Sequence, residues 1–130
     1  EQEGLAARIE FRPVDLTAAG DYGAGFDAIL MSNLVHCHGV DACRHMVGEA
    51  ARRLAPGGRL LVKDIDTADD RSGPDGALRF GLTMARLSTG GDVYPVSEVQ
   101  AWCAEAGLAL ERVFGLRRSP TQYLLVARKP

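Results

Sequence analysis

The sequence lacks the features that mark specialised classes of protein. Its longest stretch without a charged side chain runs only from Ala28 to Val40 and includes two histidines, whereas a helix that spans a bilayer needs about 20 apolar residues. Its three cysteines cannot all pair within one chain, so we expect reduced thiols and a cytoplasmic protein. Repeats and low-complexity segments are also missing. We therefore expect a protein that is neither membrane-spanning nor fibrous nor disordered.

The charges are nearly balanced. Lys and Arg number 15 against 17 Asp and Glu, which leaves a formal net charge of -2 and no general attraction to nucleic acid or to an anionic membrane surface. With 130 residues, 46% of them hydrophobic and 25% charged, the chain can bury about two thirds of its unfolded surface. We expect one globular domain over residues 1–130.

The hydrophobic pattern predicts an α/β fold. Charged and apolar residues alternate from Arg8 to Val14, which is typical of a half-buried strand, whereas Phe26 to Met31 and Arg59 to Lys63 are apolar runs typical of buried parallel strands. Two further strands, Leu108 to Leu116 and Tyr123 to Lys129, should pair antiparallel across a turn at residues 118–121.

Four helices are expected between and before these strands. Glu1 to Arg8 resembles the last turns of a helix, and Ala77 to Leu87 has helical spacing. Asp41 is a plausible N-cap for a helix whose apolar stripe (Cys43, Met46, Val47, Ala50, Ala51, Leu54) ends before Pro56-Gly57-Gly58. Ser97 and Gln100 fit a capping box at the start of a helix that contains Trp102 as a core residue and stops at Gly107.

Polar residues follow the three predicted parallel strands. Asp15 ends the first, Ser32 and Asn33 followed by His36 end the second, and Asp64 ends the third. These groups should converge at one edge of the sheet, where α/β proteins place their active sites. A histidine held by a carboxylate in one tautomer can act as a general base toward a hydroxyl. The alternative is that His36 bonds to a backbone carbonyl and Asp64 caps the following loop.

Other candidates have a functional and a structural interpretation. The segment from His36 to His45 holds five His and Cys residues, but the first three are too close in sequence to converge on zinc easily, so we expect no metal. Asp15 either accepts hydrogen bonds from a ligand or ends its strand as a turn residue. Tyr94 belongs either to a substrate lid or to an ordinary loop. Phe80 and Met84, one helical turn apart, either line an acceptor pocket or pack in the core.

The order of these elements and several strings resemble the second half of class I S-adenosylmethionine-dependent methyltransferases. The string Leu54 to Val62 (LAPGGRLLV) is similar to the family's frequent entry into its fifth strand. Ile9 to Leu16 resembles the third strand, Phe26 to His36 the fourth, and Ser97 to Gly107 with the two strands after it the final helix and reversed hairpin. The resemblance implies a partial Rossmann-like sheet in a three-layer α/β/α fold, without the first two strands and with an antiparallel C-terminal hairpin.

The same resemblance implies S-adenosyl-L-methionine as the cofactor. It places Asp15 and Leu16 beside the adenine, and Met31, Ser32 and Asn33 beside the methionine part of the cofactor.

Within the family, the closest pattern is that of small-molecule O-methyltransferases related to plant phenol-methylating and bacterial polyketide-tailoring enzymes. There a histidine shortly after the fourth strand deprotonates the acceptor hydroxyl and an acidic residue at the end of the fifth supports it; His36 and Asp64 fall on these positions. The sequence departs from the pattern at Cys37, where the family often has Asp, and at Val93, where a second acidic residue is expected and Asp92 lies one position away. In the functional interpretation given above for the helix and the loop, the substrate contacts are Phe80, Met84 and Tyr94.

The family's glycine-rich GxGxG loop does not occur in these 130 residues. We therefore interpret the chain as the C-terminal portion of a methyltransferase domain, inactive alone, with the N-terminal half supplied elsewhere or by a second copy of the chain. In the family's strand order, Arg8 to Val14 would then have no neighbouring strand. The alternative interpretation is a degenerate module that serves interaction or dimerisation without catalysis.

Overall fold

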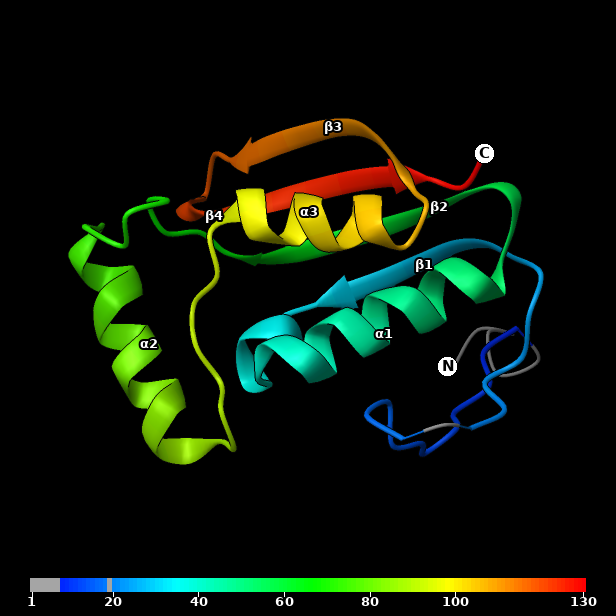
Figure 1. Ribbon diagram of the computed structural model, residues 1–130, viewed down its shortest axis with the longest axis horizontal. Coiled ribbons are helices and arrows are strands. Elements are labelled where there is room, and N and C mark those ends of the chain that lie inside the picture. Colours follow the sequence, from blue (N-terminus) through cyan, green and yellow to red (C-terminus); the bar gives the residue numbers. More distant parts are fainter. Residues whose placement is uncertain (1–7, 19) are drawn as a thin grey trace, which may run out of the picture.

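The structure, a computed structural model, describes residues 8–18 and 20–130. Within these residues four strands form one sheet in the order β1-β2-β4-β3, and three α-helices and a 3-10 helix accompany it (Figure 1). The strands are β1 (Phe26–Ser32), β2 (Leu54–Ile65), β3 (Ala109–Leu116) and β4 (Ser119–Arg128). The helices are η1 (Val35–Cys37, the 3-10 helix), α1 (Val40–Arg53), α2 (Asp75–Leu87) and α3 (Val96–Glu105).

The sheet mixes parallel and antiparallel pairs. β1 runs parallel to β2, β2 pairs antiparallel with β4, and β3 and β4 form a hairpin. This confirms a partial Rossmann-like α/β sheet with an antiparallel C-terminal hairpin. The predicted turn at residues 118–121 was wrong, because Leu116 already pairs with Ser119 across Arg117 and Arg118. Pro120 is tolerated because it lies at the start of its strand.

The helices α1 and α3 cover one face of the sheet. Alternate residues of the central strands point toward them and are buried, among them Leu60 and Val62 on β2 and Leu125 on β4. An ion pair between Arg44 and Glu105, 2.8 Å long, also joins the two helices. Within the described residues no helix covers the opposite face, so this part of the chain forms two of the three expected layers (Figure 1).

The predicted apolar stripe of α1 is confirmed, since Cys43, Met46, Val47, Ala50 and Ala51 are all buried. The N-cap, however, is Gly39 instead of Asp41, which lies in the first turn. After α1 the chain enters β2 through Pro56-Gly57-Gly58, where Gly57 has a φ of +80°. A Cβ atom on Gly58 would lie 2.8 Å from the carbonyl oxygen of Phe26, so this second glycine lets β1 and β2 approach closely.

The predicted capping box of α3 was wrong. The N-cap is Pro95, and the Ser97 hydroxyl instead donates to Asp69 Oδ1 at 2.6 Å. Asp66 Oδ1 accepts the backbone N–H of Val96 at 2.9 Å. Carboxylates from the loop after β2 thus replace the local cap that the sequence predicts. Trp102 is confirmed as a core residue.

The N-terminal segment does not form the predicted strand. Residues 8–14 adopt no regular structure and are exposed; Phe11, for example, is 90% exposed. A lone extended segment cannot pair its backbone groups, and no strand of the sheet neighbours it (Figure 1). The helix predicted over Glu1 to Arg8 lies almost wholly outside the described residues.

Strand β1 is an edge strand, whereas the sequence predicts a buried one. Leu30 is 63% exposed and Phe26 39% exposed. Among the described residues β2 is the only strand that pairs with β1, and Leu30 pairs with Leu61 on the face of the sheet that no helix covers. None of the helices in this described part of the chain is both long and apolar enough to cross a membrane.

Candidate active site

A tight turn after β1 positions His36. Asn33 adopts the left-handed conformation with φ +54°, a region that Asn enters more readily than most residues. Its N–H donates to the Lys63 carbonyl at 2.9 Å and its Oδ1 accepts from Lys63 Nζ at 2.7 Å. Both bonds tie the end of β1 to β2, and the next residues form η1 beside the end of β2.

His36 and Asp64 form a buried pair at this edge of the sheet. The Nδ1 atom of His36 lies 2.6 Å from Asp64 Oδ1. Asp64 Oδ1 also accepts the Ile65 N–H at 2.8 Å, and its Oδ2 accepts the Val35 N–H at 3.1 Å. His36 is 8% exposed and Asp64 only 1%. The structure therefore brings together the two residues that spacing and resemblance assign to catalysis.

The geometry selects one tautomer of His36. A carboxylate can only accept a hydrogen bond, so Nδ1 carries the proton when the imidazole is neutral. The other ring nitrogen, Nε2, is then an acceptor, and it has no hydrogen-bond partner among the described residues. This is the arrangement that a general base requires.

Helix α2 contributes an aromatic side chain to the site. The rings of Phe80 and His36 meet edge to face, with centroids 4.9 Å apart and an interplanar angle of 86°. Phe80 and Met84 are both partly buried. Phe80 therefore lies beside the imidazole, and Met84 lies one helical turn further along α2.

Tyr94 lies in the core. It is 3% exposed, its hydroxyl donates to the His38 carbonyl at 2.6 Å, and its ring packs edge to face against Trp102. Burial raises the pKa of Tyr94 to about 12. Of the two interpretations of Tyr94, this placement favours an ordinary packed loop, and its contact with a substrate stays a prediction.

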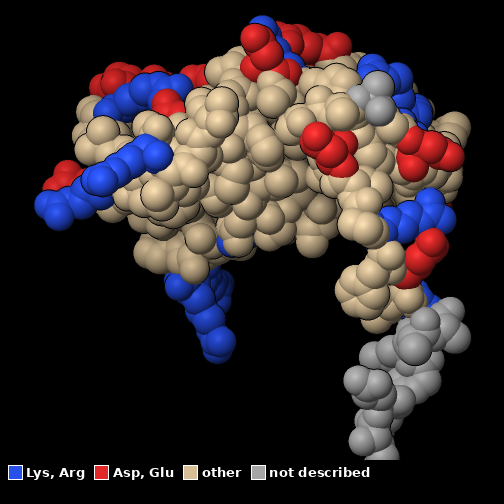
Figure 2. Space-filling model, turned by 90° about the horizontal axis from the view of Figure 1, so that it is seen from below, with Lys and Arg blue, Asp and Glu red and all other residues tan. Residues whose placement is uncertain are grey.

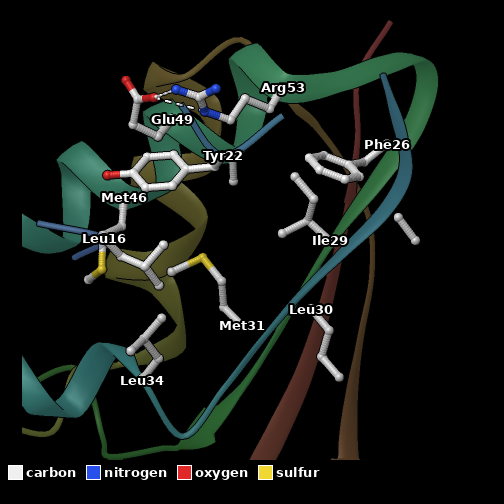
Figure 3. A pocket seen from close by; sticks show the side chains of 12 residues that line it. Leu16, Tyr22, Phe26, Ile29, Leu30, Met31, Leu34, Met46, Glu49 and Arg53 are labelled. Carbon is white, nitrogen blue, oxygen red and sulfur yellow. Dashed lines mark hydrogen bonds and ion pairs between the residues drawn. The ribbon is translucent and has the colours of Figure 1, made fainter. Parts of the chain in front are cut away.

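Two of the five predicted cofactor residues line one cavity. Leu16 and Met31 face an apolar cavity of about 320 Å³ beside β1, which the Glu49–Arg53 ion pair and the Tyr22 ring border (Figure 3). Its apolar walls fit the adenine ring or the thioether chain of the cofactor.

The remaining three residues lie outside that lining. Ser32 and Asn33 follow at the end of β1, and Asn33 is engaged by Lys63. Asp15 Oδ1 accepts bonds from the N–H and hydroxyl of Thr17, which also lower the pKa of Asp15. These bonds are typical of a turn residue, which is the structural one of the two interpretations of Asp15.

The segment from His36 to His45 is organised by packing. Cys43 is fully buried and its Sγ donates to the Val35 carbonyl at 3.2 Å. Burial, with Asp64 nearby, raises the pKa of Cys43 to about 12. Within the described residues, no three His, Cys, Asp or Glu side chains are grouped so that they could hold a metal ion.

Two residues that shape the site escape sequence reasoning. A Cβ atom on Gly91 would lie 2.5 Å from the His36 carbonyl oxygen, so this glycine allows the loop after α2 to pack on η1. Arg71 donates to Asp92, Glu98 and the Val93 carbonyl, and thereby ties the loop before α2 to the segment after it. From the sequence alone, the Gly90-Gly91 pair indicates only the end of a helix, and Arg71 is one charged residue in a polar loop.

The comparisons with known proteins point to one kind of enzyme. No family model matches the chain. It is 30% identical over 109 residues to 3-hydroxy-5-methyl-1-naphthoate 3-O-methyltransferase of Streptomyces sahachiroi. It is 28% identical over 104 residues to the tetracenomycin polyketide synthesis 8-O-methyl transferase TcmO of Streptomyces glaucescens. Each match covers 80% of this chain, which spans only 30% of each relative's length.

Solved structures share the fold over almost the whole chain. An O-methyltransferase family 2 protein from Planctomyces limnophilus, in complex with apigenin, superposes with a TM-score of 0.87 at 29% identity, over 99% of this chain and 37% of its own. PigF with SAH superposes with a TM-score of 0.85 over 98% of this chain and 41% of its own, and at 23% identity shares the fold alone.

The fold is therefore that of part of a Rossmann-like methyltransferase. The predicted resemblance to small-molecule O-methyltransferases is confirmed, and it extends over a portion of those enzymes.

Proposed function

We propose that residues 1–130 form the C-terminal part of the catalytic domain of an S-adenosylmethionine-dependent O-methyltransferase. The enzyme would methylate a hydroxyl group of a small molecule, with His36 as general base and Asp64 as the residue that orients it. The observation that carries the proposal is the buried His36–Asp64 pair, with Nδ1 and Oδ1 2.6 Å apart.

The pair can remove a proton from a hydroxyl. The free Nε2 atom of His36 accepts the acceptor's proton, and Asp64 stabilises the imidazolium that forms. The cofactor, when bound, supplies an electrophilic methyl group on its sulfonium sulfur. Because that transfer is an in-line displacement, the chain's further task is to hold the acceptor oxygen in line.

The surroundings of the pair supply candidate binding residues. Leu16, Met31, Ser32 and Asn33 would contact the cofactor, with Asp15 beside the adenine as the resemblance implies. Phe80 and Met84 would line the acceptor pocket, and Tyr94 would be a third substrate contact.

An aromatic or polyketide-like acceptor is the substrate class that we propose. The edge-to-face contact between Phe80 and His36 offers an aromatic wall next to the base. The names of the two Streptomyces relatives, which refer to a naphthoate and to tetracenomycin polyketide synthesis, support the same class.

We propose that a further strand completes the sheet at β1. Within the described residues β1 has a partner strand on one side only, and its apolar side chains Leu30 and Phe26 are exposed. A parallel strand beside β1, together with the layer that packs over it, would cover them. The face seen in Figure 2, from below the view of Figure 1, has uncharged side chains over its middle and charged ones mainly toward its margin. The strand would come from a longer protein or from a second copy of the chain.

The free Cys37, Cys43 and Cys103 fit the expected cytoplasmic setting.

The same exposed edge supports the second candidate, a methyltransferase-like module that binds a partner without catalysis. Calorimetric titration of the complete protein with S-adenosylhomocysteine separates the two. Binding at micromolar to millimolar concentrations supports the enzyme, and no binding at millimolar ligand would leave only the module.

The base assignment is tested by His36→Ala in the complete protein. We expect turnover to fall at least about tenfold with the affinity for S-adenosylhomocysteine nearly unchanged, because the imidazole acts on the acceptor. The matched control is His38→Ala, which removes a nearby histidine that does not contact Asp64. Unchanged turnover in His36→Ala would refute the base.

A further inference from the structure

The Tyr123 hydroxyl is a buried polar group that the proposed mechanism leaves without a task. Tyr123 lies on β4 and is 2% exposed. Among the described residues no group forms a hydrogen bond with this hydroxyl. Burying a hydroxyl without a partner destabilises a fold, so buried hydroxyls nearly always have one.

The sheet register places Tyr123 next to the candidate catalytic carboxylate. Tyr123 and Asp64 are directly opposite each other in the antiparallel β2–β4 ladder, so their side chains emerge on the same face of the sheet. That face is the one covered by α1 and α3, where Cys43 and Cys103 are also buried. The two strands thus place a phenol and a carboxylate opposite each other on the same buried face of the sheet.

Asp64 has capacity for one more donor. Its Oδ1 accepts from His36 and from the Ile65 N–H, and its Oδ2 accepts from the Val35 N–H. A carboxylate offers about four acceptor positions, so one remains on Oδ2. The phenol is fit to donate, because burial and then the nearby Asp64 and Asp66 carboxylates raise the pKa of Tyr123 and keep its proton in place.

We propose that Tyr123 is a positioning residue of the His36–Asp64 pair: its hydroxyl donates, through one buried water molecule, to Asp64 Oδ2. A bridging water of this kind commonly satisfies polar groups inside proteins. The bond would hold the carboxylate in the orientation that His36 needs. It would also spread part of the negative charge of Asp64, and so limit how strongly the imidazolium of His36 is stabilised.

The titration of His36, followed by NMR in the complete protein, tests this role. Other ionisable side chains lie near Tyr123 and His36: Asp66 after β2, Cys43 on α1, Cys103 on α3 and Cys37 beside His36. Helix α2 contributes only the uncharged Phe80. Tyr123→Phe removes only the hydroxyl. The carboxylate then concentrates its charge on His36, and we expect the midpoint measured for His36 to be higher in the variant than in the unmodified protein.

Two controls test whether the effect of Tyr123→Phe on His36 passes through Asp64. Tyr22→Phe removes a hydroxyl that bonds to the Asp15 carbonyl and is remote in sequence from the pair; it should leave the midpoint unchanged. In an Asp64→Asn background, Tyr123→Phe should no longer shift it.

An unchanged or lowered midpoint in Tyr123→Phe, together with an equal or higher melting temperature, would show that the hydroxyl is idle and overturn the proposal. Should the variant not fold, the hydroxyl proton of Tyr123 in the unmodified chain decides. A slowly exchanging signal with a cross-peak to bound water supports the bond, and a rapidly exchanging one overturns it.

The meaning of this residue for catalysis rests on the proposed function, but the NMR readout needs no methyl transfer. A shifted midpoint in a protein that transfers no methyl group would retain Tyr123 as a positioning residue and refute only the enzyme.

Discussion

Strands β1 and β2 lie side by side in one parallel ladder and are both rich in apolar residues, yet their burial differs. β2 has β1 on one side and β4 on the other, and its Leu60 and Val62 are fully buried. Among the described residues β1 pairs with β2 alone, and its Leu30, which is 63% exposed, lies on the face opposite Leu60 and Val62, where no helix packs. Met31 of β1 shares the face of Leu60 and Val62 and is only 6% exposed. An apolar run thus predicts a strand, whereas the strands beside it and the helices over each face decide how deeply each side chain is buried.

The contrast is sharpest for one substitution made in each strand. Leu60→Ala should lower the free energy of unfolding by about 3 kcal/mol, because it leaves a cavity in a packed core. Leu30→Ala removes the same atoms from a largely exposed position and should cost less than about 0.5 kcal/mol. Urea unfolding of both variants measures the difference. Equal losses would mean that β1 is covered in solution, for example by a second copy of the chain.

High pH should weaken the packed region. Burial raises the pKa of the Cys103 thiol from 9.0 to about 11. The folded state then binds this proton more tightly than the unfolded state, so stability is complete below pH 9 and falls as the pH rises toward 11. The loss from Cys103 is about 2–3 kcal/mol.

Urea unfolding at pH 8 and pH 11 measures this loss. Cys103→Ala should flatten the dependence by the stated amount, while Cys37→Ala, at a partly exposed position, should flatten it less. If the free energy of unfolding depends on pH equally in Cys103→Ala and in the unmodified protein, the Cys103 thiol does not contribute to the loss of stability at high pH.

The third prediction concerns the contact between the loop after α2 and η1, which carries His36. Gly91→Ala would force a Cβ atom against the His36 carbonyl and should cost about 2 kcal/mol. Gly76→Ala is the matched control, since a Cβ atom there meets nothing within 4 Å; alanine in a helix should leave stability equal or slightly higher. Thermal unfolding compares them. A Gly91→Ala variant as stable as its control would mean that the loop after α2 detaches freely from η1.

The sequence predicts much of this molecule because local patterns determine much of it. The unit of β1, α1 and β2 follows from apolar runs and from a helical stripe that includes Cys43 and Val47. The proximity of His36 and Asp64 follows from a rule of topology, since the carboxyl ends of adjacent parallel strands meet at one edge of the sheet.

The rest depends on contacts between distant segments. Sequence reasoning misassigned the start of α3 because Asp66 and Asp69, on the loop after β2, satisfy it instead of Ser97 and Gln100. It missed the exposure of β1 because an apolar run does not reveal how many strands flank it or whether helices cover both of its faces. Tyr123 escaped as a candidate because only the strand register places it opposite Asp64.

The bond from the Val35 amide to Asp64 has a consequence for how the site comes into being. One carboxylate holds both the backbone of η1 and the ring of His36, and it belongs to the most enclosed strand of the sheet. The orientation of His36 by Asp64 therefore depends on the formation of the β1–β2 pair. Amide exchange at Val35 would consequently report assembly of the catalytic geometry and of the parallel ladder as a single event.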